Sequence, residues 1–273
     1  MFDLDKYRNS CSKLIKLFKY GRAGIYIGGY ELLGADVFGH QIIIDSRHYG
    51  SLKTLYCPPS AEVSVIAFML EYITPGMIVV DVGSGCGYYT IIASSFVGEI
   101  GEVYSFEAIP ECFKLLQKNL RLNDIDNVKC INRLIANETK KVSQKYFGEN
   151  YEFFFLKSSE HQEKATEVET ISLDQYFQDK QSRIDFVKIN DEKLLPAILK
   201  GMDGIIDNNR DIKILCLFNK NSIVENEGNL DEFFDHIESK KLEIFLFPNL
   251  SPIDKEDLLE YTITKNILLS RSK

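Results

Sequence analysis

The segment 79–89 restricts what this chain can fold into more than any other. It reads as a buried strand with an acidic residue, Asp81, near its end, then a turn with three glycines, then the start of a helix. A second apolar run, 103–106, is followed by Glu107. A strand, a glycine turn, a helix and a second strand that ends in a carboxylate form the pattern with which α/β proteins hold an adenosine-containing cofactor.

The spacing of the glycines does not fit a dinucleotide. The G-x-G-x-x-G pattern would begin at Gly83 and Gly85, but Tyr88 stands where the third glycine is needed. If the pattern begins instead at Gly85 and Gly87, that position holds Thr90. The turn fits D-x-G-x-G-x-G, which favours S-adenosylmethionine (SAM) as the cofactor.

The charges in and around the turn also favour SAM. SAM has no phosphate; it carries an ammonium, a carboxylate and a sulfonium, so Asp81 is useful beside it but unfavourable beside a pyrophosphate. Glu107 offers two acceptor oxygens to the two ribose hydroxyls, and Ala108 and Ile109 can enclose the adenine. The predicted cofactor-binding residues are Asp81, Gly83, Ser84, Gly85, Gly87, Tyr88, Glu107, Ala108, Ile109 and Asn137. For Tyr88, helix packing is the more frequent role.

Strand and helix patterns alternate after residue 76. Strands are predicted near 77–81, 102–106, 128–133, 185–189 and 212–218, and helices near 88–96, 110–122, 194–206 and 229–239. This alternation predicts an α/β fold, a Rossmann-like and mostly parallel sheet with helices on both faces. Two late strands, 242–247 and 261–269, predict an antiparallel strand at the sheet edge.

Two domains of unequal size are predicted. Residues 1–57, a helix followed by short strands, form an extension that caps the substrate or contacts another copy, and residues 58–273 form the SAM-binding domain. The polar segment 138–170 reads as a loop with a hairpin near 151–156, either a lid over the acceptor or an uninvolved surface loop.

The composition limits which cellular compartment and which binding partners are expected. The net charge of −8 and the pI of about 5.2 argue against a nucleic-acid partner. Six scattered cysteines without C-x-x-C pairs suit a reducing compartment, and four scattered histidines indicate no metal site. No apolar run approaches the roughly 20 residues of a membrane span, so a cytoplasmic protein is expected.

The ordered motifs between residues 36 and 218 resemble the FkbM family of SAM-dependent methyltransferases. The resemblance rests on the glycine turn 81–90, on 103–110 and 119–128, and on 171–174 with 185–189. It implies a class I methyltransferase fold and transfer of a methyl group to a hydroxyl of a small molecule, sugar or glycan. The oligomeric state is left open, with a homo-oligomer as one interpretation.

One departure from that family lies at the end of the strand 185–189. The family continues Lys-Ile-Asp-Val-Glu-Gly, whereas this chain has Asn190 in place of the Asp and Lys193 in place of the Gly. Asn cannot act as a base, although it can orient an acceptor. The predicted catalytic residues are Glu192, Asp191, Asn190 and Lys188. Two alternatives stay open, methylation of an amino group and a catalytically impaired relative that binds SAM.

Overall fold

A computed structural model describes residues 3–18, 25–35, 38–46, 60–142, 168–179 and 183–271. The predicted hairpin near 151–156 lies outside these residues. The strands are β1 (Ile25–Gly28), β2 (Glu31–Ala35), β3 (Gln41–Asp45), β4 (Ile78–Val82), β5 (Glu102–Phe106), β6 (Val128–Ile131), β7 (Leu134–Ile135), β8 (Lys141–Val142), β9 (Val168–Ile171), β10 (Phe186–Ile189), β11 (Lys213–Phe218), β12 (Glu243–Leu246), β13 (Ser251–Pro252) and β14 (Lys265–Ser270). The helices are α1 (Leu4–Phe18), α3 (Ser60–Tyr72), α4 (Tyr88–Val97), α5 (Pro110–Leu122), α7 (Leu173–Phe177), α8 (Leu195–Lys200), α9 (Asp203–Asn208), α10 (Lys220–Glu225), α11 (Leu230–Ser239) and α12 (Lys255–Leu259).

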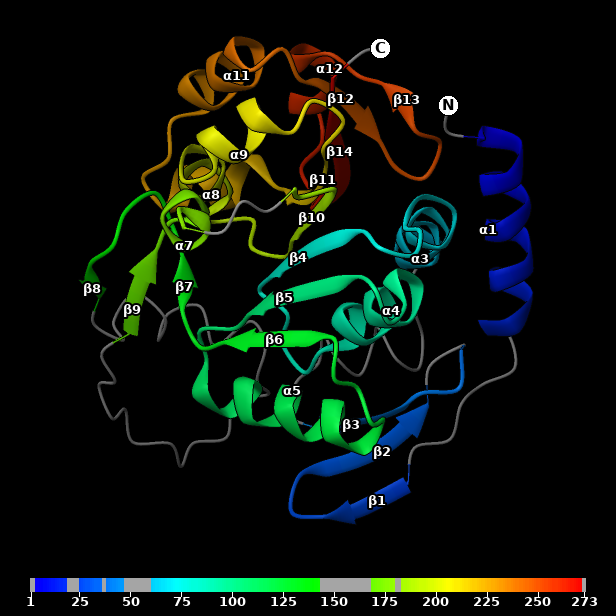
Figure 1. Cartoon of the computed structure of the whole chain (residues 1–273). Helices are drawn as coiled ribbons and strands as arrows, with labels where there is room; N and C mark the ends of the chain where they lie inside the picture. The colour runs from blue at the N-terminus through cyan, green and yellow to red at the C-terminus, as the bar shows by residue number, and fades with distance from the viewer. Residues whose placement is uncertain are drawn as a thin grey trace.

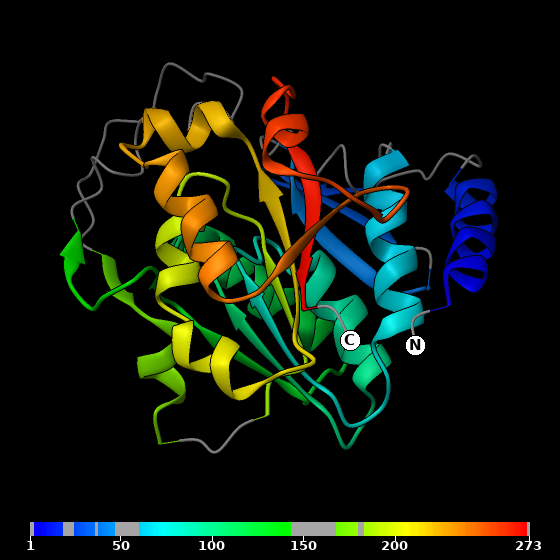
Figure 2. The same ribbon diagram turned by 90° about the horizontal axis from the view of Figure 1, so that it is seen from above.

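The centre of the molecule is an eight-stranded sheet in the order β13-β12-β14-β11-β10-β4-β5-β6 (Figures 1 and 2). The strands from β11 to β6 pair in parallel, while β14 runs antiparallel between β11 and β12. Helices cover both faces. This confirms the predicted fold class, a class I methyltransferase fold with a mostly parallel sheet. Because chain order reverses between β4 and β10, a ligand crevice is expected beyond the carboxyl ends of these two strands.

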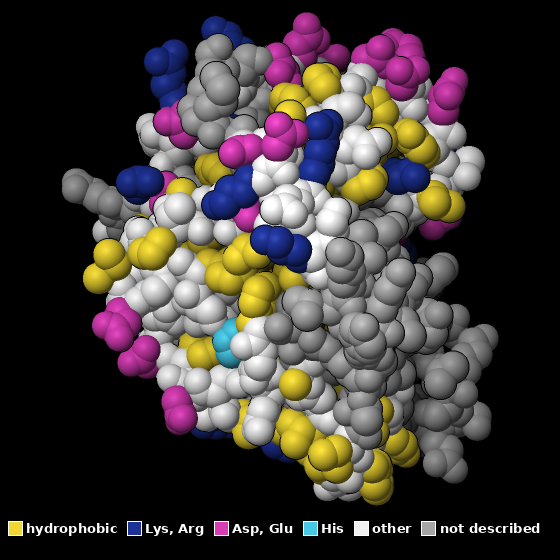
Figure 3. All heavy atoms as spheres, turned by 90° about the vertical axis from the view of Figure 1, so that its right-hand side faces the viewer, with side chains coloured by type: hydrophobic (Ala, Val, Ile, Leu, Met, Phe, Trp, Pro, Cys, Tyr) yellow, Lys and Arg dark blue, Asp and Glu magenta, His cyan; other side chains and the backbone are white. Residues whose placement is uncertain are grey.

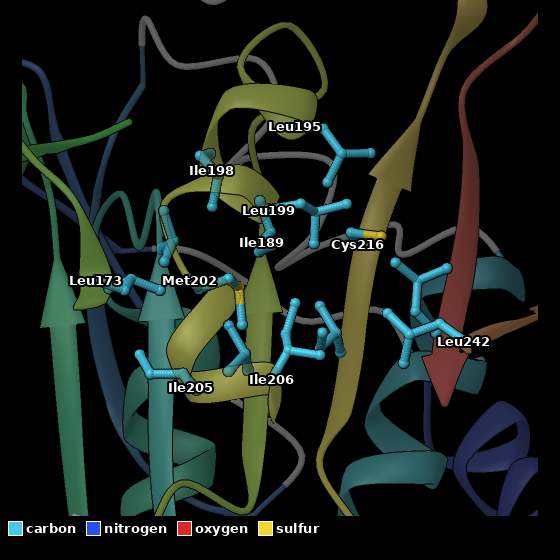
Figure 4. Packing of buried hydrophobic residues seen from close by; sticks show 14 of the residues in the cluster. Leu173, Ile189, Leu195, Ile198, Leu199, Met202, Ile205, Ile206, Cys216 and Leu242 are labelled. Carbon is cyan, nitrogen blue, oxygen red and sulfur yellow. The ribbon is translucent and has the colours of Figure 1, made fainter. Parts of the chain in front are cut away.

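Two apolar cores flank the sheet, one on each face. Side chains of α8, α9 and α11 pack on β10 and β11, and Figure 4 shows Leu195 and Ile198 with Ile189 and Cys216 in this cluster. Residues of α1, α3, α4 and α5 form the core on the other face. The near-continuous apolar runs of the central strands follow from burial on both faces.

The predicted helix 194–206 is two helices, α8 and α9, that meet at Gly201. A Cβ at Gly201 would lie 2.1 Å from the carbonyl oxygen of Ala136. Only a residue without a side chain permits this close approach of two backbones, and the chain turns there. The sequence pattern missed this break because the contact joins segments that lie far apart along the chain.

Among the described residues, the N-terminal segment contacts the sheet domain through α3, α5 and the backbone of Pro248. Helix α1 packs on α3, where Ser10 and Lys6 both contact the Glu71 carboxylate at 2.6 and 2.7 Å. The small antiparallel sheet β1-β2-β3 adjoins α5. On the face that carries α1, Lys and Arg side chains lie among Asp and Glu side chains (Figure 3). Within the described ranges, no helix has the length and apolar character needed to cross a membrane.

Two asparagines, Asn119 on α5 and Asn123 directly after it, occupy the outer edge of β3. Asn119 accepts from Ile43 N and donates to Ile43 O, both at 2.8 Å, and Asn123 makes the same pair of bonds with Gln41 at 2.8 and 2.7 Å. Side chains four residues apart share a helix face, and alternate residues of a strand point their backbone groups to the same side. The helix therefore satisfies a strand edge that is otherwise open to pairing with other chains.

We predict that Asn119→Ala destabilises the protein more than Asn123→Ala. Asn119 is fully buried and also donates to Cys86 O at 2.8 Å in the glycine turn, whereas Asn123 is partly exposed. Each buried backbone group left unpaired costs about 1–3 kcal/mol. Urea unfolding followed by circular dichroism measures the difference. Equal unfolding midpoints for the two variants would contradict the interpretation.

Candidate functional site

The glycine turn lies at the carboxyl end of β4 and is held by the neighbouring strand. Gly83 N and Ser84 N both donate to Phe106 O, at 2.9 and 3.1 Å. Gly83 has φ 73°, and a Cβ there would lie 3.2 Å from Asn190 O. Gly87, with φ 92°, would place a Cβ 2.6 Å from the Leu116 side chain. A residue with a side chain would therefore be strained at both positions.

Glu107 closes the other side of this turn. Its buried carboxylate accepts from Gly85 N at 2.6 Å and from Ile109 N at 2.8 Å. Asn132 donates to the carbonyl oxygens of Glu107 and Ala108 at 2.7 and 3.1 Å, which holds the backbone that follows β5. Burial raises the pKa of Glu107 to about 7, although the two backbone N–H groups oppose the shift.

Asp81 and Lys188 lie side by side beneath the turn. They are register partners on β4 and β10, and each is 2% exposed. Thr90 donates to Asp81 Oδ2 at 2.6 Å and lies 2.9 Å from Ser105 Oγ. Burial raises the pKa of Asp81 and lowers that of Lys188, while the attraction between the two groups opposes both shifts. Burial alone would favour the neutral form of each group, and their mutual attraction favours the charged forms.

The end of β10 holds the predicted catalytic residues. Asn190 is exposed, and its Oδ1 accepts from Lys188 Nζ at 3.1 Å. Asp191 Oδ1 accepts from Lys193 N and Leu194 N at 3.1 and 3.0 Å, which organises the turn before α8. The oxygens of Glu192 accept from Ser222 Oγ at 2.7 Å and from Thr264 Oγ1 at 2.6 Å. Asp191 and Glu192 therefore make structural hydrogen bonds within the chain.

The remaining predicted residues are spread more widely. Ser84 lies in the turn, Ala108 and Ile109 lie directly after Glu107, and Tyr88 is buried with its ring against that of Tyr89. Asn137 is different, because it is exposed and its Cα lies near Gly201 at the end of α8. The other residues lie in or directly after β4, β5 and β10, whereas Asn137 follows β7.

The predicted site residues did not include four contributors to this edge of the sheet, namely Thr90, Asn132, Tyr89 and Glu62. Thr90 holds Asp81, Asn132 holds the backbone after β5, and Tyr89 donates to the Glu62 carboxylate of α3 while its ring packs on Lys188. Thr90 could have been found, since it lies in the first turn of the helix after the glycines, where its side chain faces the preceding strand. Asn132 and Glu62 carry no local signal.

One hollow among the described residues lies away from this edge. It has a volume of about 840 Å³ and is lined by residues that precede β10 and β11, among them Arg183, Asp185 and Asp211. This places it at the amino ends of the strands. Asp185 is engaged there by Arg183 and by Ile78 N. Ligands of open parallel sheets bind at the opposite edge, so this hollow is not the cofactor site.

The residues at the carboxyl edge fit SAM. The glycines allow a ligand to approach the backbone, and each Glu107 oxygen already has one hydrogen bond and can accept a second from a ribose hydroxyl. Asp81 Oδ1 is buried without a hydrogen-bond partner. A buried acceptor of this kind is rare, and a cationic ligand group would satisfy it. The charges and the backbone therefore suit a positively charged nucleoside.

Comparison with known proteins supports this cofactor. The model of the family "Protein-L-isoaspartate(D-aspartate) O-methyltransferase (PCMT)" matches residues 56–133, from α3 through β6. A protein-L-isoaspartate O-methyltransferase of Methanothrix thermoacetophila is 43% identical over 56 residues, which are 20% of this chain and 27% of the relative. One from Methanococcoides burtonii is 36% identical over 69 residues, 25% of this chain and 34% of the relative. The matches thus span about a third of the relatives' length or less.

A solved rRNA methylase of Streptococcus thermophilus is also similar in structure. It has 15% sequence identity and a TM-score of 0.47 and covers 78% of this chain and 97% of its own. Because the family match contains the glycine turn and Glu107, the predicted cofactor, S-adenosyl-L-methionine, is confirmed. The coarse prediction of a SAM-dependent methyltransferase is supported by the same match.

Two sequence-based predictions are wrong. The family model that matches is PCMT and not FkbM, and the named relatives act on protein-L-isoaspartate. The predicted transfer to a hydroxyl of a small molecule, sugar or glycan therefore has to be replaced by an acceptor of another class. The error has a physical reason. The glycine turn and the Glu107 carboxylate contact the cofactor, so their pattern carries no information about the methyl acceptor.

We predict that cofactor binding weakens as pH falls below about 7. Ribose hydroxyls donate hydrogen bonds to the ionised form of the Glu107 carboxylate. Below the Glu107 pKa of about 7 the carboxyl group is protonated, so it must lose this proton before the ligand binds. The affinity for S-adenosylhomocysteine should then drop by up to about tenfold per pH unit. Calorimetric titration at several pH values between about 5.5 and 8, on both sides of the Glu107 pKa, measures this affinity.

The matched control is Glu107→Gln, which keeps the size of the side chain and removes its titration. This variant should bind the ligand more weakly and with little dependence on pH in the same range. A wild-type affinity that stays constant across the range would show that Glu107 does not change protonation on binding.

Proposed function

We propose that this protein transfers the SAM methyl group to a carboxyl oxygen of a protein or peptide. The supporting observation is that both carboxylates at the end of β10, Asp191 and Glu192, accept hydrogen bonds from other groups of the described chain. Asn190 cannot accept a proton as a base would. A hydroxyl acceptor needs a base, whereas a carboxylate is already ionised at neutral pH.

The described residues would contribute by positioning the reacting groups. SAM supplies a sulfonium methyl group that is activated toward a nucleophile. When a carboxylate oxygen attacks, a C–O bond forms, the C–S bond breaks, and its electron pair neutralises the sulfur. A negative and a positive charge disappear together, so exclusion of water favours the reaction. The turn at Gly83 and the exposed Asn190 amide would align the acceptor with the methyl group.

The names of the relatives support this class of acceptor. They are protein-L-isoaspartate O-methyltransferases, so the methylated group in those proteins is a carboxyl group of a protein. The match ends at residue 133, before β10 and the rest of the acceptor side. For this chain we therefore propose the carboxyl class of acceptor, with an isoaspartyl peptide as the first substrate to test.

The N-terminal extension would contribute to acceptor binding. Asn119 links β3 to the backbone of Cys86 in the glycine turn, so the small sheet is held close to the cofactor edge. We propose that residues 1–57 cap the acceptor side of the methyltransferase domain, residues 58–273. The contact through Asn119 supports this arrangement.

An assay with labelled SAM tests the proposed acceptor. The protein is incubated with an isoaspartyl peptide, with the aspartyl peptide of the same sequence, and with a peptide whose carboxyl groups are amidated. We expect label in the isoaspartyl peptide that is released as volatile methanol by alkali, because methyl esters hydrolyse whereas methyl ethers and methylamines do not. Alkali-stable label, or equal label in the amidated peptide, would contradict a carboxyl acceptor.

We predict that Glu192→Gln and Asp191→Asn keep most of the methyl transfer activity. Neither carboxylate has to remove a proton from a carboxylate acceptor, and each amide retains an oxygen that accepts a hydrogen bond. Loss of a general base would instead lower the rate by about 10²–10⁴-fold. The variants are compared with wild type by kcat and by thermal unfolding. A loss of that size in a variant that folds would show that a base is required.

A further inference from the structure

Three neighbouring strands present different chemistry along the cofactor edge. Glu107 follows β5, the glycine turn follows β4, and Lys188 lies in β10, and these strands are adjacent in the sheet. SAM is a chain of three parts, a nucleoside, a sulfonium and an α-amino acid. If Glu107 holds the ribose, the amino-acid end lies toward β10, across the point where chain order reverses.

Lys188 and Asp81 lie side by side at that point without forming a direct ion pair. The electrostatic attraction between them favours the charged form of each, yet no contact within 4.0 Å joins the ammonium to the carboxylate in the described chain. Lys188 donates to Asn190 Oδ1 at 3.1 Å and lies 4.3 Å from the centre of the Tyr89 ring. Asp81 Oδ1 has no hydrogen-bond partner. Each buried group therefore keeps unused hydrogen-bonding capacity.

Two buried opposite charges that do not touch are unfavourable, because neither gains enough from the other to offset lost hydration. A ligand that carries both an ammonium and a carboxylate on one carbon would relieve both sides at once. Its ammonium would donate to Asp81 Oδ1, and its carboxylate would accept from Lys188 Nζ. The α-amino acid end of SAM has this arrangement of charges.

We propose that Lys188 is a cofactor-binding residue that holds the α-carboxylate of the methionine part of SAM, opposite Asp81. The proposal rests on the use of SAM in the proposed function and adds a residue on a strand outside the matched segment 56–133. The cation–π contact with Tyr89 and the bond to Asn190 hold the ammonium in place from two sides. Lys188 thereby fixes the position of the sulfonium relative to the acceptor.

A pair of ligands tests this assignment without any turnover. S-adenosylhomocysteine carries the α-amino acid, and methylthioadenosine has the same nucleoside without it. For Lys188→Met we expect about 10- to 100-fold weaker binding of S-adenosylhomocysteine, the loss typical of a removed charge-assisted hydrogen bond. Binding of methylthioadenosine should stay at the wild-type value, which also shows that the nucleoside pocket is intact. Isothermal titration calorimetry measures both affinities.

Lys129→Met is the matched control. Lys129 also lies over a tyrosine ring, 4.9 Å from the centre of Tyr104, and also bonds a neighbouring side chain, Glu102 at 2.7 Å. It is half exposed and lies in β6, whose register partner on β5 is Tyr104, away from Lys188. This variant should bind both ligands as wild type does.

Three results would overturn the proposal. One is unchanged binding of S-adenosylhomocysteine by Lys188→Met, and another is an equal loss for both ligands, which indicates a structural role. If Lys188→Met does not fold, Lys188→Gln is measured in the same way, and the same two results decide. The third is a wild-type protein that binds methylthioadenosine and S-adenosylhomocysteine equally well. Failure of the wild type to bind either ligand would instead overturn the proposed function together with this inference.

Discussion

The parallel pairing of β4 with β10 is the constraint on which the rest of the site depends. It sets Asp81 beside Lys188 and brings the end of β10 against the glycine turn, where Asn190 O would contact a Cβ at Gly83. Because helix α4 leaves β4 on one face and α8 leaves β10 on the other, the strands separate above this pair and expose their carboxyl ends. The crevice is thus a consequence of strand order.

The same geometry buries charged side chains at this edge, and their lost hydration costs free energy. Asp81, Glu107 and Lys188 are all buried, and burial shifts the pKa of each toward its neutral form. Proteins retain such groups where a ligand or a neighbouring charge compensates for lost hydration. Here backbone N–H groups, Thr90 and Asn190 supply part of the compensation. A cationic nucleoside with a zwitterionic end would supply the rest.

The cofactor and the acceptor are recognised by different parts of the chain, and this explains which predictions were right. The cofactor is encoded in the turn and in Glu107, which lie within 30 residues of each other and inside the family match. The acceptor depends on the end of β10 and on segments beyond the match. Motifs shared among SAM-dependent enzymes could therefore identify the cofactor, while the resemblance built on the same motifs assigned the wrong family and acceptor.

The sequence by itself determined the elements whose signals are local. Three glycines with positive φ, an acidic residue before them and a carboxylate after the next strand specify a cofactor turn, and the alternation of strands and helices specifies the sheet. Tertiary structure alone decided the break at Gly201, the pairing of Asn119 with β3, and the hydrogen bonds that engage Glu192. It also set Lys188 opposite Asp81. Most of these contacts join residues 30 to 107 positions apart, and periodicity along a chain holds no information about backbones and side chains that meet only after the sheet has formed.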